Sequence, residues 1–235
     1  MLIIGIGGFG VAIALTPYTI PLWVVAIVGS GLAALTAYYH EQKGAYALFA
    51  VFIGAVLWAG GYAMEMSSAP SQMAIFWYKI HFIGSAIVPT AIFVMALRFT
   101  GRDDLIRARN IALLAAMPVV TTVLIVTSHD IWIQGHIANT GPDAVLPLTY
   151  QFGPWFPIYA YYSLAIAVVA IGMFVQAALE RSDESWVNAT TAFLVATVLP
   201  TVGTGIYVIG NTTIDYGPFA FLISGVCIMA AMFYL

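Results

Sequence analysis

Seven runs of about 20 mostly apolar residues follow one another along this sequence, and each is long enough to cross a membrane as a helix. Of the 235 residues, 62% are hydrophobic and 7% are charged, whereas soluble domains carry about 25% charge. A soluble fold is therefore excluded. The expected fold is an all-α integral membrane protein, a seven-transmembrane helical bundle. Its spans are residues 20–39, 46–66, 76–97, 110–128, 154–179, 187–210 and 217–235.

Lysine and arginine are distributed unevenly between the loops. The loops after the first, third and fifth spans lie on one side of the membrane and carry six lysine and arginine residues. On the other side, Lys79 is the only positively charged residue of the sequence. The positive-inside rule then predicts that the first span starts outside and that the carboxyl terminus is cytoplasmic. The six residues on the predicted cytoplasmic side are Lys43, Arg98, Arg102, Arg107, Arg109 and Arg181.

The two ends of the chain carry separate expectations. Residues 1–19 form an apolar segment whose hydrophobic part is short for a span. We expect an interfacial helix that leads into the first span, with an eighth span or a cleaved signal as alternatives. Residues 20–235 form the membrane domain. Because the last span stops at Leu235 with no polar flank, we expect a cytoplasmic region beyond it.

Glu65 and Lys79 are rare charges within the apolar spans. Trp58, Gly61, Tyr62 and Glu65 share one helical face through their spacing of three and four residues. Lys79 follows near the start of the next span, at a similar outer depth, so a pair with Glu65 is expected. Ionisable groups at membrane depth normally face a cavity or a partner. The pair therefore either lines a polar ligand pocket that opens outward or is a salt bridge that joins two helices.

Further polar and aromatic side chains fall on the outer halves of other spans. His81 is interpreted as a hydrogen-bonded histidine, with a pH switch or a haem ligand as alternatives. Two helical faces carry the other residues. The face of the fifth span carries Trp155, Tyr159 and Tyr162, the face of the sixth span carries Pro200, Thr204, Tyr207 and Asn211, and Asp215 lies at the outer rim. The two faces either line one cavity with Trp58 and Tyr62 or form an aromatic belt and ordinary helix packing.

Residues 129–153 separate the fourth and fifth spans. Apolar and polar residues alternate roughly on both sides of the turn-rich sequence NTGPD. This pattern predicts a β-hairpin that covers the outer mouth of the bundle, with an irregular loop as the alternative.

Several functions are disfavoured by the sequence. A single cysteine, Cys227, excludes a multi-cysteine metal site, and no basic patch for nucleic acid is present. We expect no metal, no cofactor and no catalytic constellation. A small-solute transporter or channel is the alternative to a sensor, although the cytoplasmic halves of the spans are nearly free of polar side chains. The candidate ligand-binding residues are Trp58, Tyr62, Glu65, Lys79, His81, Tyr159, Tyr207, Asn211 and Asp215.

An ordered set of short segments resembles the amino-terminal seven-transmembrane region of prokaryotic sensor histidine kinases, which also precedes diguanylate cyclases. The resemblance covers the chain from about residue 20 to its end. It implies a membrane sensor in the plasma membrane of a prokaryote, and it supplies no shared ligand. We expect an unknown small-molecule or lipid-like ligand in the outer half of the bundle. The resemblance also implies a carboxyl-terminal output domain and a homodimeric full-length protein. The segments are LWAGGYAMEM (57–66), FWYKIHFIGSAIVP (76–89), RFTGR (98–102), MPVVTTVLIVTSHDIW (117–132), FGPWFPIYAYYSL (152–164), LPTVGTGIYVIG (199–210) and IDYGPFAF (214–221).

Overall fold

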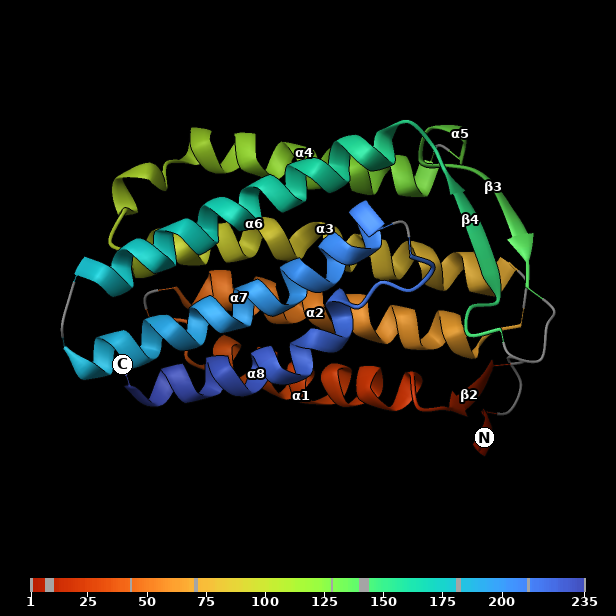
Figure 1. Cartoon of the computed structure of the whole chain (residues 1–235), viewed down its shortest axis with the longest axis horizontal. Helices are drawn as coiled ribbons and strands as arrows, with labels where there is room; N and C mark the ends of the chain where they lie inside the picture. The colour runs from red at the N-terminus through yellow and green to blue at the C-terminus, as the bar shows by residue number, and fades with distance from the viewer. Residues whose placement is uncertain are drawn as a thin grey trace.

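Long apolar helices run up and down through a single bundle in the computed structural model (Figure 1). The structure describes residues 2–6, 11–42, 44–69, 72–127, 129–139, 144–180, 183–210 and 212–234. Every predicted span coincides with a helix whose ends differ by only a few residues, which confirms the seven-transmembrane bundle. The helices are α1 (Thr19–Tyr38), α2 (Ala45–Ser67), α3 (Gln72–Phe99), α4 (Ala108–Thr127), α6 (Trp155–Glu180), α7 (Glu184–Gly210) and α8 (Gly217–Tyr234).

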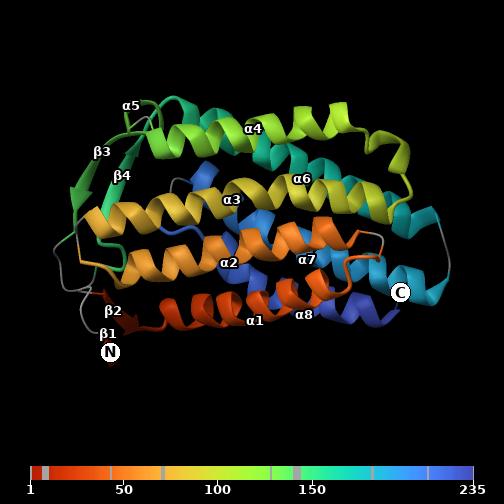
Figure 2. The same ribbon diagram turned by 180° about the vertical axis from the view of Figure 1, so that it is seen from behind.

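Six of these helices form a closed ring in the order α1, α2, α3, α6, α7 and α8, in which α8 packs back against α1. Helix α4 packs on the outside of this ring, mainly against α3 (Figure 2). Its buried residues in the described part are Thr121 and Ile125, whereas α2 and α3 are buried along most of their lengths. The centre of the bundle therefore lies between α2, α3, α6, α7 and α8.

Glycines allow α2 and α3 to approach each other closely. A Cβ atom on Gly61 would lie 2.7 Å from the backbone nitrogen of His81. A Cβ atom on Gly84 would lie 2.6 Å from the carbonyl oxygen of Gly54 and would also overlap the backbone nitrogen of Trp58. Small residues at such contacts let helices pack backbone to backbone where lipid provides no hydrophobic driving force. The α2–α3 pair is therefore the most closely packed part of the ring around the residues of interest.

Two antiparallel hairpins lie at the same end of the bundle. The short helix α5 (His129–Trp132) leads into β3 (Ile133–Ala138), which pairs with β4 (Leu148–Phe152) and confirms the predicted hairpin. Trp132, Ile133 and Leu148 are buried. The hairpin is therefore held on the bundle by an apolar face that packs against the start of α3 and α6.

The amino-terminal hairpin corrects one expectation. β1 (Leu2–Ile6) pairs with β2 (Val11–Leu15), so these residues do not form the expected interfacial helix. Isoleucine and valine favour extended backbone, and glycine disfavours helix interiors. A segment that crosses the hydrocarbon layer must form a helix so that its backbone groups bond to one another. This segment is too short to cross, so that requirement does not apply to it.

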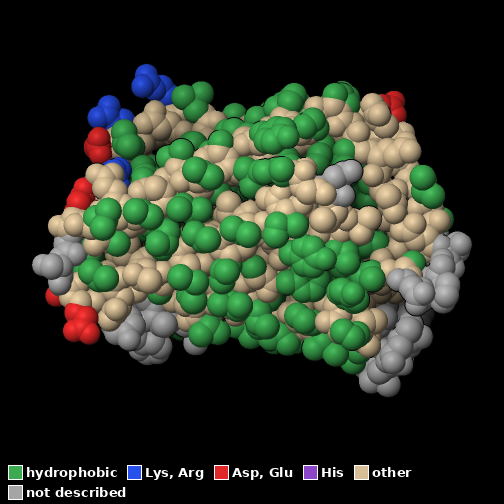
Figure 3. Space-filling view, viewed as in Figure 1, with side chains coloured by type: hydrophobic (Ala, Val, Ile, Leu, Met, Phe, Trp, Pro, Cys, Tyr) green, Lys and Arg blue, Asp and Glu red, His purple; other side chains and the backbone are tan. Residues whose placement is uncertain are grey.

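Charged side chains gather at the end of the bundle opposite the hairpins, while hydrophobic side chains cover much of its long face (Figure 3). Arg98 pairs with Asp103 at 3.1 Å, in the short helix η1 (Asp103–Leu105). Arg102 donates a hydrogen bond to the Gln176 side chain at 2.7 Å. The described arginines thus belong to the loop end that the positive-inside rule assigns to the cytoplasm.

Candidate functional site

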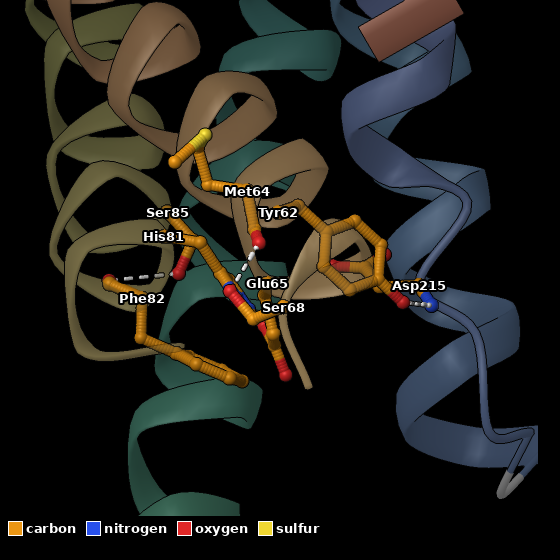
Figure 4. A network of polar contacts seen from close by, with 8 residues as sticks. All are labelled: Tyr62, Met64, Glu65, Ser68, His81, Phe82, Ser85 and Asp215. Atoms are coloured by element: carbon orange, nitrogen blue, oxygen red, sulfur yellow. Dashed lines mark hydrogen bonds and ion pairs between the residues drawn. The ribbon is translucent and has the colours of Figure 1, made fainter. Parts of the chain in front are cut away.

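Glu65 and His81 form a buried pair between α2 and α3 (Figure 4). His81 Nδ1 lies 2.7 Å from Glu65 Oε2, and the two side chains are 5% and 1% exposed. The His81 ring also packs against Tyr62 and Tyr78, with centroids 4.9 Å and 5.4 Å away. Gly61 makes this arrangement possible because it lets the His81 backbone approach α2 one turn away from Glu65. The pair therefore joins α2 to α3 through a short contact between two ionisable side chains.

The predicted Glu65–Lys79 pair is wrong. Lys79 Nζ instead lies 3.5 Å from the carbonyl oxygen of Val126 in α4, at the surface. In an α-helix, two positions along the chain correspond to a rotation of about 200° about the helix axis, so the two side chains point to nearly opposite sides. Because His81 faces α2, Lys79 must face away from it. Glu65 and Lys79 lie at a similar depth, but Lys79 is on the side of α3 that faces away from α2, so the expected salt bridge does not form.

Asp215 joins this region from the connection between α7 and α8. Its backbone N–H donates a hydrogen bond to the Tyr62 hydroxyl at 3.2 Å (Figure 4). Its carboxylate Oδ1 accepts hydrogen bonds from the backbone N–H of Gly217 at 2.9 Å and from the Thr204 hydroxyl at 3.3 Å. The side chain is buried, and this burial raises the pKa of Asp215 to about 6, partly offset by the Gly217 hydrogen bond. The carboxylate thus caps the start of α8.

This connection enters the bundle and does not pass over it. A Cβ atom on Gly217 would lie 3.0 Å from the Trp58 ring and would overlap the Thr204 hydroxyl. Trp58 precedes the end of α2 at Ser67 by a helical length of about 13 Å. Non-helical backbone at such a depth occurs where it is enclosed by protein or lines a cavity. Helix α8 therefore starts at the level of the candidate residues, beneath the end of α2.

A cavity of about 240 Å³ lies between these groups and the β3–β4 hairpin. Its wall includes Thr149 and Thr213, which are exposed, so the cavity reaches the surface between the hairpin and the α7–α8 connection. Five candidates from the sequence line it: Tyr62, Glu65, His81, Tyr207 and Asp215.

A second cavity of about 50 Å³ lies deeper and shares Tyr207 and Asp215 with the first. It is lined by Trp58, Tyr159 and Ser85, and the Tyr159 hydroxyl is hydrogen-bonded to Ser85 at 2.8 Å. Pro200 and Thr204 line it as well, as the predicted face of the sixth span requires. Two further candidates, Trp58 and Tyr159, therefore line the deeper cavity and are absent from the wall of the first. Asn211 lies outside the described residues.

Two aromatic residues of the fifth span are placed differently from the shared-cavity interpretation. The Trp155 indole N–H donates to the Thr121 hydroxyl at 3.0 Å, and the Tyr162 hydroxyl donates to the Leu114 carbonyl oxygen at 3.1 Å. Both acceptors belong to α4. These side chains attach the peripheral helix α4 to α6. Of the three aromatic residues predicted on this face, Tyr159 is the one that lines a central cavity.

The sequence interpretation missed much of the aromatic wall. Tyr78 and Phe82 line the cavity from α3, and Phe152 and Phe156 line it from β4 and the start of α6. Spacing contained a usable signal, since Tyr78, His81, Phe82 and Ser85 follow the i, i+3, i+4, i+7 pattern of one helical face. The hairpin residues had no comparable signal, because their contact with the cavity depends on how the hairpin folds back.

No group of three or more possible metal ligands occurs within the described ranges. A family model described as the N-terminal 7TM region of histidine kinase matches residues 21–235. No curated protein matches the chain. All residues of the two cavities lie within the matched range.

Proposed function

We propose that this chain, which belongs to the family of N-terminal seven-transmembrane regions of histidine kinases, detects a ligand in the cavity beneath the β3–β4 hairpin. The observation that carries the proposal is the convergence of Glu65, His81 and Asp215 in a cavity of about 240 Å³ that reaches the surface. Buried ionisable groups around a cavity cost folding free energy and are typical of functional sites. The chain itself acts as receptor and leaves catalysis to the output domain.

The arginine-rich end supports an outward-facing cavity. The positive-inside rule places the loops with Arg98, Arg102, Arg107 and Arg109 in the cytoplasm, so the hairpin end faces outside. We propose the plasma membrane of a prokaryote as the location, lipid as the surrounding partner, and a homodimer as the form of the full-length protein. Helix α8 then leads from the cavity to the cytoplasmic side, where a histidine kinase output domain would follow.

Tyr62 supplies a route for the signal. Its ring lines the cavity, and its hydroxyl holds the backbone of Asp215, two residues before α8 begins. A ligand changes the equilibrium between two helix arrangements only if it binds them with different affinity. A ligand that contacts Tyr62 or Asp215 would do so by altering the contact at the start of α8.

A transporter or channel fits less well, because it requires a continuous polar path. At the end of the bundle opposite the hairpins, aromatic rings pack between α3, α6 and α7, and an apolar cavity of about 500 Å³ lies between α2, α3 and α4. Phe174 and Phe193 stack at a centroid distance of 5.8 Å, and Phe99 stacks on Trp186 at 4.7 Å. The two cavities of the candidate site lie in the half nearer to the hairpins.

The Tyr62→Phe variant tests the proposal in the full-length protein. Loss of one hydrogen bond, worth about 1 kcal/mol, is expected to shift basal autophosphorylation in nanodiscs by about threefold or more. Tyr46→Phe is the matched control, because Tyr46 lies on the same helix and is 73% exposed. Equal autophosphorylation in wild type and both variants would contradict a route through Tyr62 and Asp215.

A further inference from the structure

The cavity beneath the hairpin combines buried acidic groups with aromatic walls. We propose that it binds a small organic cation that carries an amine or quaternary ammonium group. This inference rests on the proposed function, since it specifies the ligand of the same site. It follows from charge, from ring geometry and from the size of the cavity.

Acidic side chains outnumber basic side chains in the cavity wall. Glu65 and Asp215 both line it, and neither lysine nor arginine occurs among its described lining residues. His81 compensates at most one negative charge, even when it is protonated. Lys79 points to the carbonyl oxygen of Val126 and cannot neutralise the pair from its position. A buried carboxylate without a compensating cation is costly, so a cationic ligand would be stabilised beside these two carboxyl groups.

Aromatic rings cover much of the remaining wall. Tyr78 and Tyr150 lie with centroids 3.8 Å apart, and Phe152 stacks on Phe156 at 3.7 Å, so one face of each of these rings is covered by its neighbour and the other face remains for a ligand. Tyr207 meets this stack at 83°. Five elements contribute the rings, namely α2, α3, β4, α6 and α7. The negative faces of several aromatic rings attract a cation within about 6 Å and are a recurrent way of holding quaternary ammonium groups.

Polar atoms of the same wall have spare capacity for a ligand. The hydroxyl groups of Tyr78 and Tyr150 are buried and make no well-formed hydrogen bond within the part of the chain that the structure describes, although the Trp132 side chain lies near the first and the Glu65 carboxyl group near the second. Burial, and then the nearby charge of Glu65, raises the pKa of the Tyr150 hydroxyl, so this group stays neutral. The Tyr150 side chain thus brings the hairpin to the acidic centre of the site.

Size limits the ligand to a small molecule. Pockets for drug-sized ligands hold about 300–1,000 Å³, and this cavity holds about 240 Å³. Its exposed wall residues, Thr149 and Thr213, provide a polar mouth. A free amine in solution and the ammonium headgroup of a membrane lipid share the required chemistry, and the experiment must separate them.

Choline and its neutral analogue 3,3-dimethylbutan-1-ol provide the test, because they differ mainly in the positive charge. The chain is placed in nanodiscs of phosphatidylglycerol, which lack ammonium headgroups, at constant ionic strength. Thermal unfolding is then measured against the concentration of each compound. We expect choline to raise the melting temperature and the neutral analogue to bind at least tenfold more weakly.

Variants locate the binding. Glu65→Gln and Asp215→Asn each remove one negative charge from the wall with little change of volume, and each is expected to weaken choline binding at least tenfold. Phe156→Leu removes an aromatic face and keeps both carboxylates, so it serves if a charge variant fails to fold. Glu41→Gln is the matched control, since Glu41 is exposed and outside the cavity, and it should bind choline as wild type does.

A third arm identifies the source of the ligand. Nanodiscs of phosphatidylcholine without free choline should stabilise the wild type, and not Asp215→Asn, if a lipid headgroup enters the site. Equal binding of choline and the neutral analogue would overturn the cation proposal while leaving a ligand cavity in place. Choline binding that is absent, or that is unaffected by all three wall variants, would also overturn it. The effect of Tyr62→Phe on autophosphorylation tests the proposed function independently of these results.

Discussion

Replacing His81 with leucine is expected to lower the free energy of unfolding by roughly 3 kcal/mol, because it leaves the buried carboxylate of Glu65 without its partner. Reversible unfolding in mixed detergent micelles, with and without the substitution, measures this change. Glu65→Gln in the His81→Leu background should recover part of the loss, since a neutral amide is easier to bury than an uncompensated carboxylate.

Lys79→Met is the matched comparison for this prediction. Lys79 is two residues from His81 in the same helix and makes a single long contact of 3.5 Å at the surface. Exposed charge contacts contribute about 0–1 kcal/mol, so little change is expected. A larger loss for Lys79→Met than for His81→Leu would show that Glu65 pairs with Lys79 after all.

The second large effect is expected at Gly84. A methyl group there would overlap the backbone of Trp58 on α2, and backbone cannot move aside as a flexible side chain can. Gly84→Ala should therefore force α2 and α3 apart, with a loss of about 3 kcal/mol in the same unfolding measurement. Because Glu65 and His81 face each other across this contact, the substitution should also weaken any ligand binding in the cavity.

Gly172→Ala is the control for this substitution. A Cβ atom on Gly172 of α6 would meet no other group within 4 Å. Alanine is favoured over glycine in a helix by about 1 kcal/mol, so this variant should be unchanged or slightly more stable. Equal losses for the two variants would contradict the close approach of α2 and α3.

Hydrophobic length and helical spacing allowed much of the fold to be predicted. The spans follow from the requirement that backbone groups in lipid bond to one another, which leaves few alternatives to a helix. The face that contains Trp58, Tyr62 and Glu65 was predictable for the same reason, since the spacing of a helix fixes which side chains point together. The hairpin over residues 129–153 was also predictable, because alternation and a turn-rich sequence favour strands.

Relations between elements were less accessible. Spacing within α3 could not tell whether Lys79 or His81 faces α2, because that depends on the rotation of the helix, which is set by packing at Gly61 and Gly84. The depth of Asp215 was not apparent either. A loop has no periodicity that reports burial, and its insertion depends on the contacts of Gly217 with Trp58 and Thr204.

Hydrogen–deuterium exchange of the Tyr62→Phe variant is the most direct test that the site beneath the hairpin is coupled to α8. The N–H of Asp215 donates to the Tyr62 hydroxyl, so loss of that acceptor should release the start of α8. In nanodiscs, exchange should become faster in residues 212–217 and in the first turn of α8. It should stay unchanged in α1 and α4, and throughout the Tyr46→Phe control. Unchanged exchange in residues 212–217, or faster exchange spread evenly over all helices, would contradict the account.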